Sequence, residues 1–159
     1  MRAIAVVAVA GCVLLSCARP LAAAEPTVAC GLLTPAQIGA ATGATIGAGS
    51  PIAKPTSCQW MGQGKTVTLT INQARAGKSP VDQFNEGKAN KLAGAITVES
   101  VGGVGDDAYY VYLAGTTRAG CGLVVKKGSS VFEIRVYGFE LSQAKAVSKT
   151  LAQNAAGKF

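Results

Sequence analysis

The sequence predicts a mixed α+β domain with a mostly antiparallel sheet of about six strands and helices packed on one face. Three observations lead to this class. Apolar and polar residues alternate in several segments, as in "KTVTLTIN" at 65–72, which is typical of half-buried strands. Short connections join most successive strands, which favours antiparallel pairing. Segments with helix caps and helical spacing of apolar residues stand before, between and after the strands.

The first 24 residues have the three parts of an export signal. Met1 and Arg2 form a basic start, and residues 3–18 are apolar and uncharged. Ala22 and Ala24 supply the small residues of a cleavage site. The apolar run is shorter than the roughly 20 residues of a membrane-spanning helix.

We therefore expect an exported chain, periplasmic or secreted, with a signal peptide at 1–24 and a single α+β domain at 25–159. A second interpretation concerns Cys17. The letters "LLSC" at 14–17 resemble a lipobox, in which this cysteine is lipidated and becomes the first residue. The chain would then be a membrane-anchored lipoprotein, and contact with a membrane is expected only in that case.

The charge of the chain argues against a nucleic-acid partner. Loss of Arg2 and Arg19 with the signal lowers the basic residues from 15 to 13, against 8 acidic ones, so the net charge is +5. The lysines are scattered, and only Lys126 and Lys127 are adjacent, so the sequence forms no basic stripe. The positive charge favours acidic envelope surfaces or simply keeps the protein soluble.

Three cysteines remain after the signal, and an oxidising compartment favours one pair among them. In "CGLVVKK" at 121–127, Cys121 shares the apolar, core-facing side of a strand, which predicts a buried, unreactive thiol. Cys30 precedes the first helix and Cys58 begins the first strand. We predict a disulfide between them, closing a loop of about 29 residues and stabilising the fold by roughly 3 to 4 kcal/mol.

The helices are marked by their first residues. Thr34, Pro35 and Gln37 form a capped start for a helix that ends near Gly43. Ser79 and Pro80 repeat the pattern for a second helix running to about residue 92, whose apolar contacts are expected from Val81, Phe84 and Leu92. A third helix covers 140–156, where Leu141, Ala144, Val147 and Leu151 line one side.

The strands are expected at 57–61, 65–72, 96–100, 108–115, 121–128 and 131–138. Between the first two lies "GQGK", which resembles the end of a phosphate-binding loop. Gln59 stands where that motif requires its first glycine, and a strand follows Lys65 instead of a helix. The glycines therefore predict a tight hairpin.

The composition excludes several kinds of catalytic site. The chain has no histidine, so Ser-His and Cys-His nucleophile pairs and histidine metal sites are excluded. Asp106 and Asp107 are adjacent at a strand start and are expected to stabilise a turn. We expect no catalytic residues, no metal and no cofactor, and therefore a protein that is not an enzyme.

A binding surface is a better candidate. If Phe132, Ile134 and Val136 face the core, Glu133, Arg135 and Tyr137 face outward. If Tyr109, Val111 and Leu113 face inward, Tyr110 and Tyr112 face outward. The candidate binding residues are then Tyr110, Tyr112, Arg135 and Tyr137, since tyrosine and arginine are enriched at binding hot spots. The alternative is a face that is solvated or covered by a helix.

A resemblance to a known family rests on five segments that occur in a fixed order along the chain. They are "CGLLTPAQIGAATG", "SCQW", "VGGVGDDAYY", "LVVKKGSSVFEIRVYG" and an alanine-rich final helix. Over most of 30–155 the chain resembles a family of small exported envelope proteins, many of them lipoproteins of actinobacteria, described as a domain of unknown function. The resemblance implies an exported α+β domain, a cysteine pair at Cys30 and Cys58, and no established catalytic residues. Cys121 departs from the family pattern.

Two functions from different classes follow. The first is an exported, non-catalytic binding or accessory protein of the cell envelope, with an envelope polymer or protein as its partner. The second is a secreted inhibitor of a hydrolase, which a small domain stapled by a disulfide suits.

Overall fold

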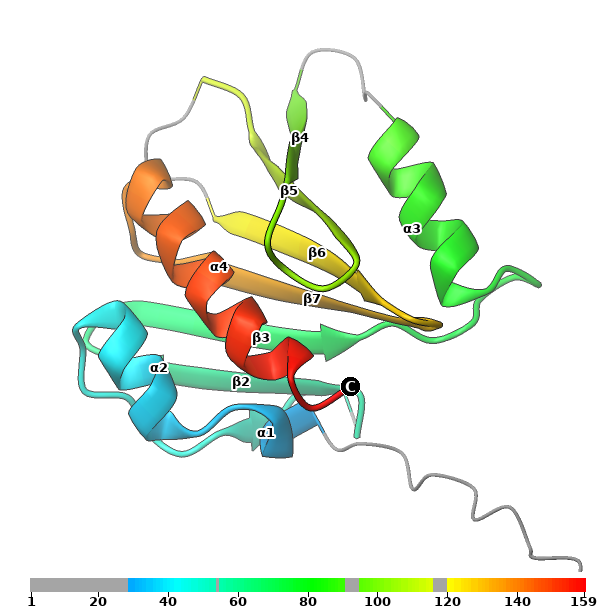
Figure 1. Cartoon of the computed structure of the whole chain (residues 1–159). Coiled ribbons are helices and arrows are strands. Elements are labelled where there is room, and N and C mark those ends of the chain that lie inside the picture. The colour runs from blue at the N-terminus through cyan, green and yellow to red at the C-terminus, as the bar shows by residue number, and fades with distance from the viewer. Residues whose placement is uncertain (1–28, 54, 91–94, 116–119) are drawn as a thin grey trace, which may run out of the picture.

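Seven antiparallel strands form one sheet in the order β1-β2-β3-β7-β6-β5-β4 (Figure 1). The computed structural model describes residues 29–53, 55–90, 95–115 and 120–159. The expected signal peptide and Cys17 lie outside these residues. Among the described residues, no helix has the length and apolar character needed to cross a membrane.

The α+β class with an antiparallel sheet is confirmed, with seven strands where about six were predicted. The strands are β1 (Ser50–Pro51), β2 (Ser57–Gly62), β3 (Lys65–Ile71), β4 (Ile96–Val101), β5 (Asp107–Leu113), β6 (Cys121–Lys127) and β7 (Ser130–Tyr137). The helices are α1 (Ala29–Leu32), α2 (Pro35–Thr42), α3 (Pro80–Ala89) and α4 (Leu141–Ala156). The additional strand is β1, a two-residue segment that pairs with Gln59 and Cys58 of β2.

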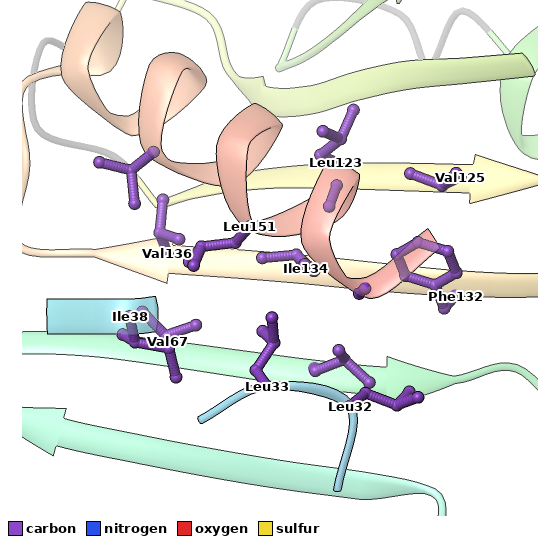
Figure 2. Packing of buried hydrophobic residues seen from close by; sticks show 14 of the residues in the cluster. Leu32, Leu33, Ile38, Val67, Leu123, Val125, Phe132, Ile134, Val136 and Leu151 are labelled. Carbon is purple, nitrogen blue, oxygen red and sulfur yellow. The ribbon is translucent and has the colours of Figure 1, made fainter. Parts of the chain in front are cut away.

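The main core lies between one face of the sheet and the helices α1, α2 and α4 (Figure 1). Phe132, Ile134 and Val136 of β7 point into this core, as predicted, and Leu151 of α4 is fully buried above them (Figure 2). The apolar side of α4 is thus confirmed. Because alternate residues of a strand share a face, this packing also fixes which side chains lie on the opposite face.

The local signals in the sequence form the predicted structures. Thr34 caps α2 through a reciprocal capping box with Gln37, and Gly43 ends the helix in the left-handed conformation. The hairpin between β2 and β3 turns on Gln63 and Gly64, both with positive φ. That two-residue turn matches the twist of the flanking strands, so "GQGK" is structural.

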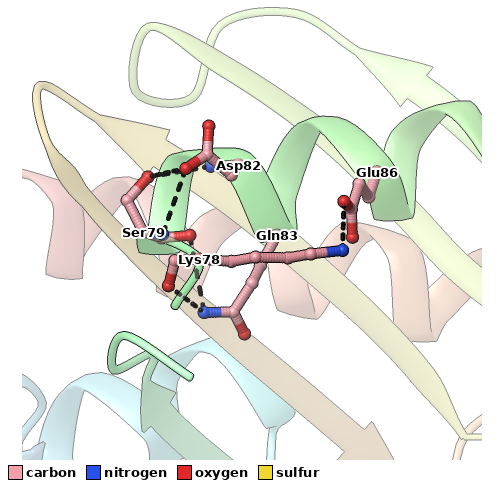
Figure 3. Close-up of polar contacts among 5 residues, drawn as sticks. All are labelled: Lys78, Ser79, Asp82, Gln83 and Glu86. Atoms are coloured by element: carbon pink, nitrogen blue, oxygen red, sulfur yellow. Dashed lines mark hydrogen bonds and ion pairs between the residues drawn. The ribbon is translucent and has the colours of Figure 1, made fainter. Parts of the chain in front are cut away.

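The helix α3 begins at a second capping box (Figure 3). The Ser79 hydroxyl accepts a hydrogen bond from the Asp82 amide, and the Asp82 carboxylate accepts one from the Ser79 amide. The Ser79 hydroxyl also donates to the Asp82 carboxylate at 2.7 Å, and this bond, together with the one from the Ser79 amide, lowers the pKa of Asp82. Lys78 pairs with Glu86 across the first turns of the helix.

The position of α3 differs from the prediction that helices pack on one face. Phe84 contacts Tyr109, Val124 and Val131, which lie on the face opposite the main core, and the partly buried Val81 packs against this second cluster. The cause is β6, where Leu123, Val124 and Val125 are consecutive apolar residues that need cover on both faces. The expected contact from Leu92 lies outside the described residues.

The disulfide between Cys30 and Cys58 is confirmed, with the two Cα atoms 5.0 Å apart. It fastens α1 to β2 beside the buried Trp60. Cys121 is a free and fully buried thiol, as predicted. Burial raises the pKa of this thiol to about 11, so it remains protonated and unreactive at neutral pH.

Candidate functional site

The sheet face opposite the main core is only partly covered. The helix α3 packs over β6 and β7 near the second cluster, and no other helix of the described residues packs on the rest of this surface. We call the uncovered part the open face. Its residues are Gln59, Met61, Thr66, Thr68, Thr70, Val111, Leu113, Gly120, Gly122, Glu133, Arg135 and Tyr137.

The centre of the open face is formed by β7. Glu133, Arg135 and Tyr137 are spaced two apart on this strand, so they share one side. The Arg135 guanidinium donates from Nε and Nη2 to Glu133 Oε1, at 2.9 and 2.6 Å. Burial opposes the charged form of Arg135, but Glu133 and the Tyr137 phenol outweigh it and raise the pKa of the guanidinium. The Arg135 guanidinium therefore remains charged at physiological pH.

Two glycines of the neighbouring strand segment create the space in which these side chains lie. A Cβ on Gly120 would stand 2.1 Å from Cε1 of Tyr137, so the ring lies directly over this glycine. A Cβ on Gly122 would stand 2.5 Å from Oε1 of Glu133. A glycine in a strand commonly marks the close approach of another group. Here Gly120 and Gly122 let the aromatic ring and the ion pair rest against the sheet.

Two shallow hollows flank this centre and share Arg135 and Tyr137. One, of about 320 Å³, is lined only by residues with polar side chains. They are Gln59, Thr68, Thr70, Glu133, Arg135 and Tyr137. The other, of about 240 Å³, is bordered by Ile96, Val111 and Leu113 together with the two glycines. The hollow on the side of β2 and β3 is thus polar, and the hollow on the side of β4 and β5 is largely apolar.

Three of the most exposed large apolar side chains lie on this face. Met61, Leu113 and Tyr137 are 61%, 50% and 42% exposed. Thr66 pairs with both Met61 and Tyr137 across the sheet, so these residues form one row. Exposed apolar side chains rimmed by polar ones are typical of an interaction site.

The structure brings together only two of the four predicted binding residues. Arg135 and Tyr137 lie at the centre of the open face. Tyr110 and Tyr112 point to the opposite side, against α4, so the predicted outward orientation of these two tyrosines is wrong. The four predicted residues therefore lie on two opposite faces of the sheet and do not form one surface.

The two tyrosines on the helix side fasten α4 to the sheet. The Tyr110 hydroxyl donates to the backbone oxygen of Lys145 at 3.1 Å, and burial raises the pKa of this phenol. The Tyr112 hydroxyl donates to Glu99 Oε2 at 2.8 Å. Lys145 reaches the same oxygen at 2.6 Å and lies 4.4 Å from the centre of the Tyr112 ring. This cluster is a structural clamp between α4, β4 and β5.

Asp106 stabilises a turn, as expected, whereas Asp107 joins β5 to α3. Asp106 accepts a hydrogen bond from the Gly128 amide at 2.7 Å and pairs with Lys127, which together lower its pKa. Asp107 pairs with Lys88 of α3. The described residues contain no group of three or more histidine, cysteine, aspartate or glutamate side chains placed to hold a metal ion.

Sequence reasoning missed most of the polar half of the open face. The alternating Thr66, Thr68 and Thr70 were recognised only as the polar side of a half-buried strand. The spacing of Gly120 and Gly122 in "AGCGL" was a signal for close packing on one side of β6.

Comparisons with family models, curated proteins and solved structures found no match to this chain.

Proposed function

We propose that this chain is an exported, non-catalytic binding protein of the cell envelope, and that its open face binds a saccharide chain. The observation that carries the proposal is the Glu133–Arg135–Tyr137 centre, held against the sheet over Gly120 and Gly122 between a polar and an apolar hollow. The expected membership of an exported envelope family is part of the same proposal.

The chemistry of the open face favours a sugar polymer. A saccharide has many hydroxyl groups and weakly polar C–H faces, so it needs both hydrogen-bonding groups and an aromatic ring. The amide of Gln59 and the hydroxyls of Thr68 and Thr70 offer donors and acceptors on a rigid strand pair. The Tyr137 ring supplies an apolar surface with a polar tip. Among the described residues of the open face, the charged ones are Glu133 and Arg135, which neutralise each other.

The dimensions suit a linear ligand. The open face crosses the five adjacent strands from β2 to β5. With about 4.8 Å between neighbouring strands, the face is roughly 19 Å long in this direction. A long, shallow and rigid surface of this kind contacts an extended chain without reorganising, which limits the entropic cost of binding.

Two features support the extracytoplasmic setting. Residues 1–24 have the pattern of an export signal, and Cys30 and Cys58 are joined in a disulfide, which is typical of oxidising compartments.

The alternative function is inhibition of a secreted hydrolase. The exposed side chains of Met61, Leu113 and Tyr137 favour it, since aromatic residues and methionine are enriched in protein interfaces.

The experiment is co-sedimentation of the processed protein with purified, protein-free wall polysaccharide. We compare the wild type with Tyr137→Ala and Arg135→Ala. The matched control is Arg75→Ala, which removes the same charge from a turn outside the open face. We expect each open-face variant to weaken retention by roughly tenfold or more, the effect of losing a binding hot spot. The control should bind like the wild type.

Two results would overturn the saccharide proposal. Equal losses in Arg135→Ala and Arg75→Ala would indicate that general positive charge causes retention. Absence of retention, together with stoichiometric capture of one hydrolase that Tyr137→Ala abolishes, would assign the same face to inhibition.

A further inference from the structure

The two edges of the sheet differ in their protection. The edge strand β1 has only two residues, one of them Pro51, and short strands and prolines are common devices against edge-to-edge association. The other edge strand, β4, has six residues with the sequence ITVESV. It is three times as long as β1 and contains no proline, and its one charged residue, Glu99, is paired with Lys145 of the same chain.

The hydrogen-bond pattern shows which groups β4 presents at its free edge. The Ala114 amide donates to the Ala95 oxygen at 3.1 Å, which makes this a hydrogen-bonded pair. Such pairs alternate along antiparallel strands, so Thr97 and Glu99 bond to β5. Ile96, Val98 and Ser100 therefore direct their amides and carbonyls away from the sheet.

We propose that β4 pairs antiparallel with β4 of a second copy of this chain, about a two-fold axis through Val98. In this register Val98 faces its own counterpart, and Ile96 of each copy faces Ser100 of the other. The outward amides and carbonyls of these residues then form the new ladder. The pairing joins two seven-stranded sheets into one continuous sheet.

The side chains on the helix side select this register. It places Thr97 opposite Glu99 of the second copy, twice, by symmetry. Glu99 uses Oε2 for both Tyr112 and Lys145, so its Oε1 has no hydrogen bond from the described residues and can accept one from the threonine hydroxyl. The positive charge of Lys145 also compensates the carboxylate.

Neighbouring registers are less favourable. An axis through Glu99 would place the two carboxylates directly opposite each other, which destabilises a strand pair. An axis through Thr97 would leave Glu99, Ser100 and Val101 beyond the paired segment, whereas the axis through Val98 leaves only Val101. The register centred on Val98 therefore combines pairing of Ile96 through Ser100 with complementary side chains.

The dimer has a geometric consequence. Both members of a cross-strand pair point to the same side of a sheet, so the open faces of the two copies would lie on one side of the joined sheet. This arrangement would let one polymer chain contact both faces and so raise avidity. Only this consequence rests on the proposed function; the dimer itself does not.

Sedimentation-equilibrium ultracentrifugation of the processed protein over a concentration series tests the pairing. We expect a reversible monomer–dimer equilibrium. Thr97→Glu places like charges opposite Glu99 at both symmetric positions and should raise the dimer dissociation constant by about tenfold. Thr97→Lys places opposite charges there and should lower it. A dissociation constant that moves in the same direction in both variants would overturn the register.

A backbone variant tests the edge itself. Ser100→Pro removes an amide that points outward, a position where an edge strand tolerates proline, and should abolish the dimer. Ser100→Ala keeps the amide and should dimerise like the wild type. Melting temperatures identify any variant that fails to fold. If Ser100→Pro does not fold, the opposite effects expected of Thr97→Glu and Thr97→Lys on the dimer dissociation constant remain the test of the pairing. A wild type that remains monomeric at all concentrations, or a dimer unchanged in Thr97→Glu, would refute the proposal.

Discussion

The Tyr137 ring lies over Gly120 in a space that the Cβ of any other residue would fill, 2.1 Å from ring atom Cε1. This relationship links a backbone position on one strand segment to the exposed aromatic ring of its neighbour. It makes the open face a preorganised surface, because the ring is supported from below and Arg135 beside it is held by Glu133.

Gly120→Ala should therefore weaken ligand binding without unfolding the protein. The new methyl group displaces the ring, which is half exposed and can swing into solvent, so the free energy of unfolding should change by less than about 1 kcal/mol. Retention on wall polysaccharide should fall about as much as in Tyr137→Ala. The control is Gly102→Ala, where a Cβ meets no atom within 4 Å. Undiminished retention in Gly120→Ala would show that the ring position is irrelevant to binding.

Alkaline pH should destabilise the fold through two buried groups. Burial raises the pKa of Tyr109 from 10.0 to about 12 and that of Cys121 from 9.0 to about 11. The unfolded chain releases these protons first, so the stabilisation is complete below about pH 9 and is lost as the pH rises through 11 and 12.

Urea unfolding between pH 8 and 11.5 measures this effect. One pKa unit corresponds to about 1.4 kcal/mol, so each group contributes at most about 3 kcal/mol to the pH dependence. Tyr109→Phe removes one of the two groups and should flatten the alkaline decline. An identical decline in Tyr109→Phe would mean that this phenol ionises equally in both states.

The disulfide should contribute strongly to stability. The bridge joins residues 28 apart in sequence, and restricting the unfolded chain over such a loop is worth about 3 to 4 kcal/mol. Replacing both Cys30 and Cys58 by alanine should lower the free energy of urea unfolding by about this amount. Reducing the wild-type protein should produce a similar loss. If reduction changes the stability by less than about 1 kcal/mol, the bridge is not a main stabilising element.

The processed chain should begin at Glu25 and carry no lipid. Cleavage after Ala24 fits the small residues before it, and the disulfide removes two hydrogen atoms from the mass. The intact mass of the exported protein, measured before and after reduction, checks both points. A chain that begins at Cys17 with the added mass of acyl groups would establish the lipoprotein alternative.

Local sequence signals predicted much of the fold. Thr34 with Gln37 and Ser79 with Asp82 each form their capping box within four residues, so no distant contact was needed to recognise them. The hairpin at "GQGK" is likewise set by its own turn residues. The pairing of Cys30 with Cys58 could be predicted because Cys121 lies in an apolar strand pattern, which indicated that it is the buried, unpaired thiol.

The orientation of β5 could not be derived in the same way. In "AYYVYL" tyrosines occupy both faces, and Tyr109 and Tyr110 are both buried, one under α3 and the other under α4. The residue pattern of β5 therefore has no clearly polar side, and it does not indicate which side faces the main core. In β7, by contrast, Glu133 and Arg135 alternate with apolar residues, and the outward positions of Arg135 and Tyr137 followed directly.

The most direct test of the open face as the binding surface is nuclear magnetic resonance of the isotope-labelled, processed protein titrated with soluble wall saccharides. We expect the largest chemical-shift changes at the amides of Thr68, Gly122, Arg135 and Tyr137, with little change in α4. Changes confined to α3 or α4, or none at saturating saccharide, would contradict it.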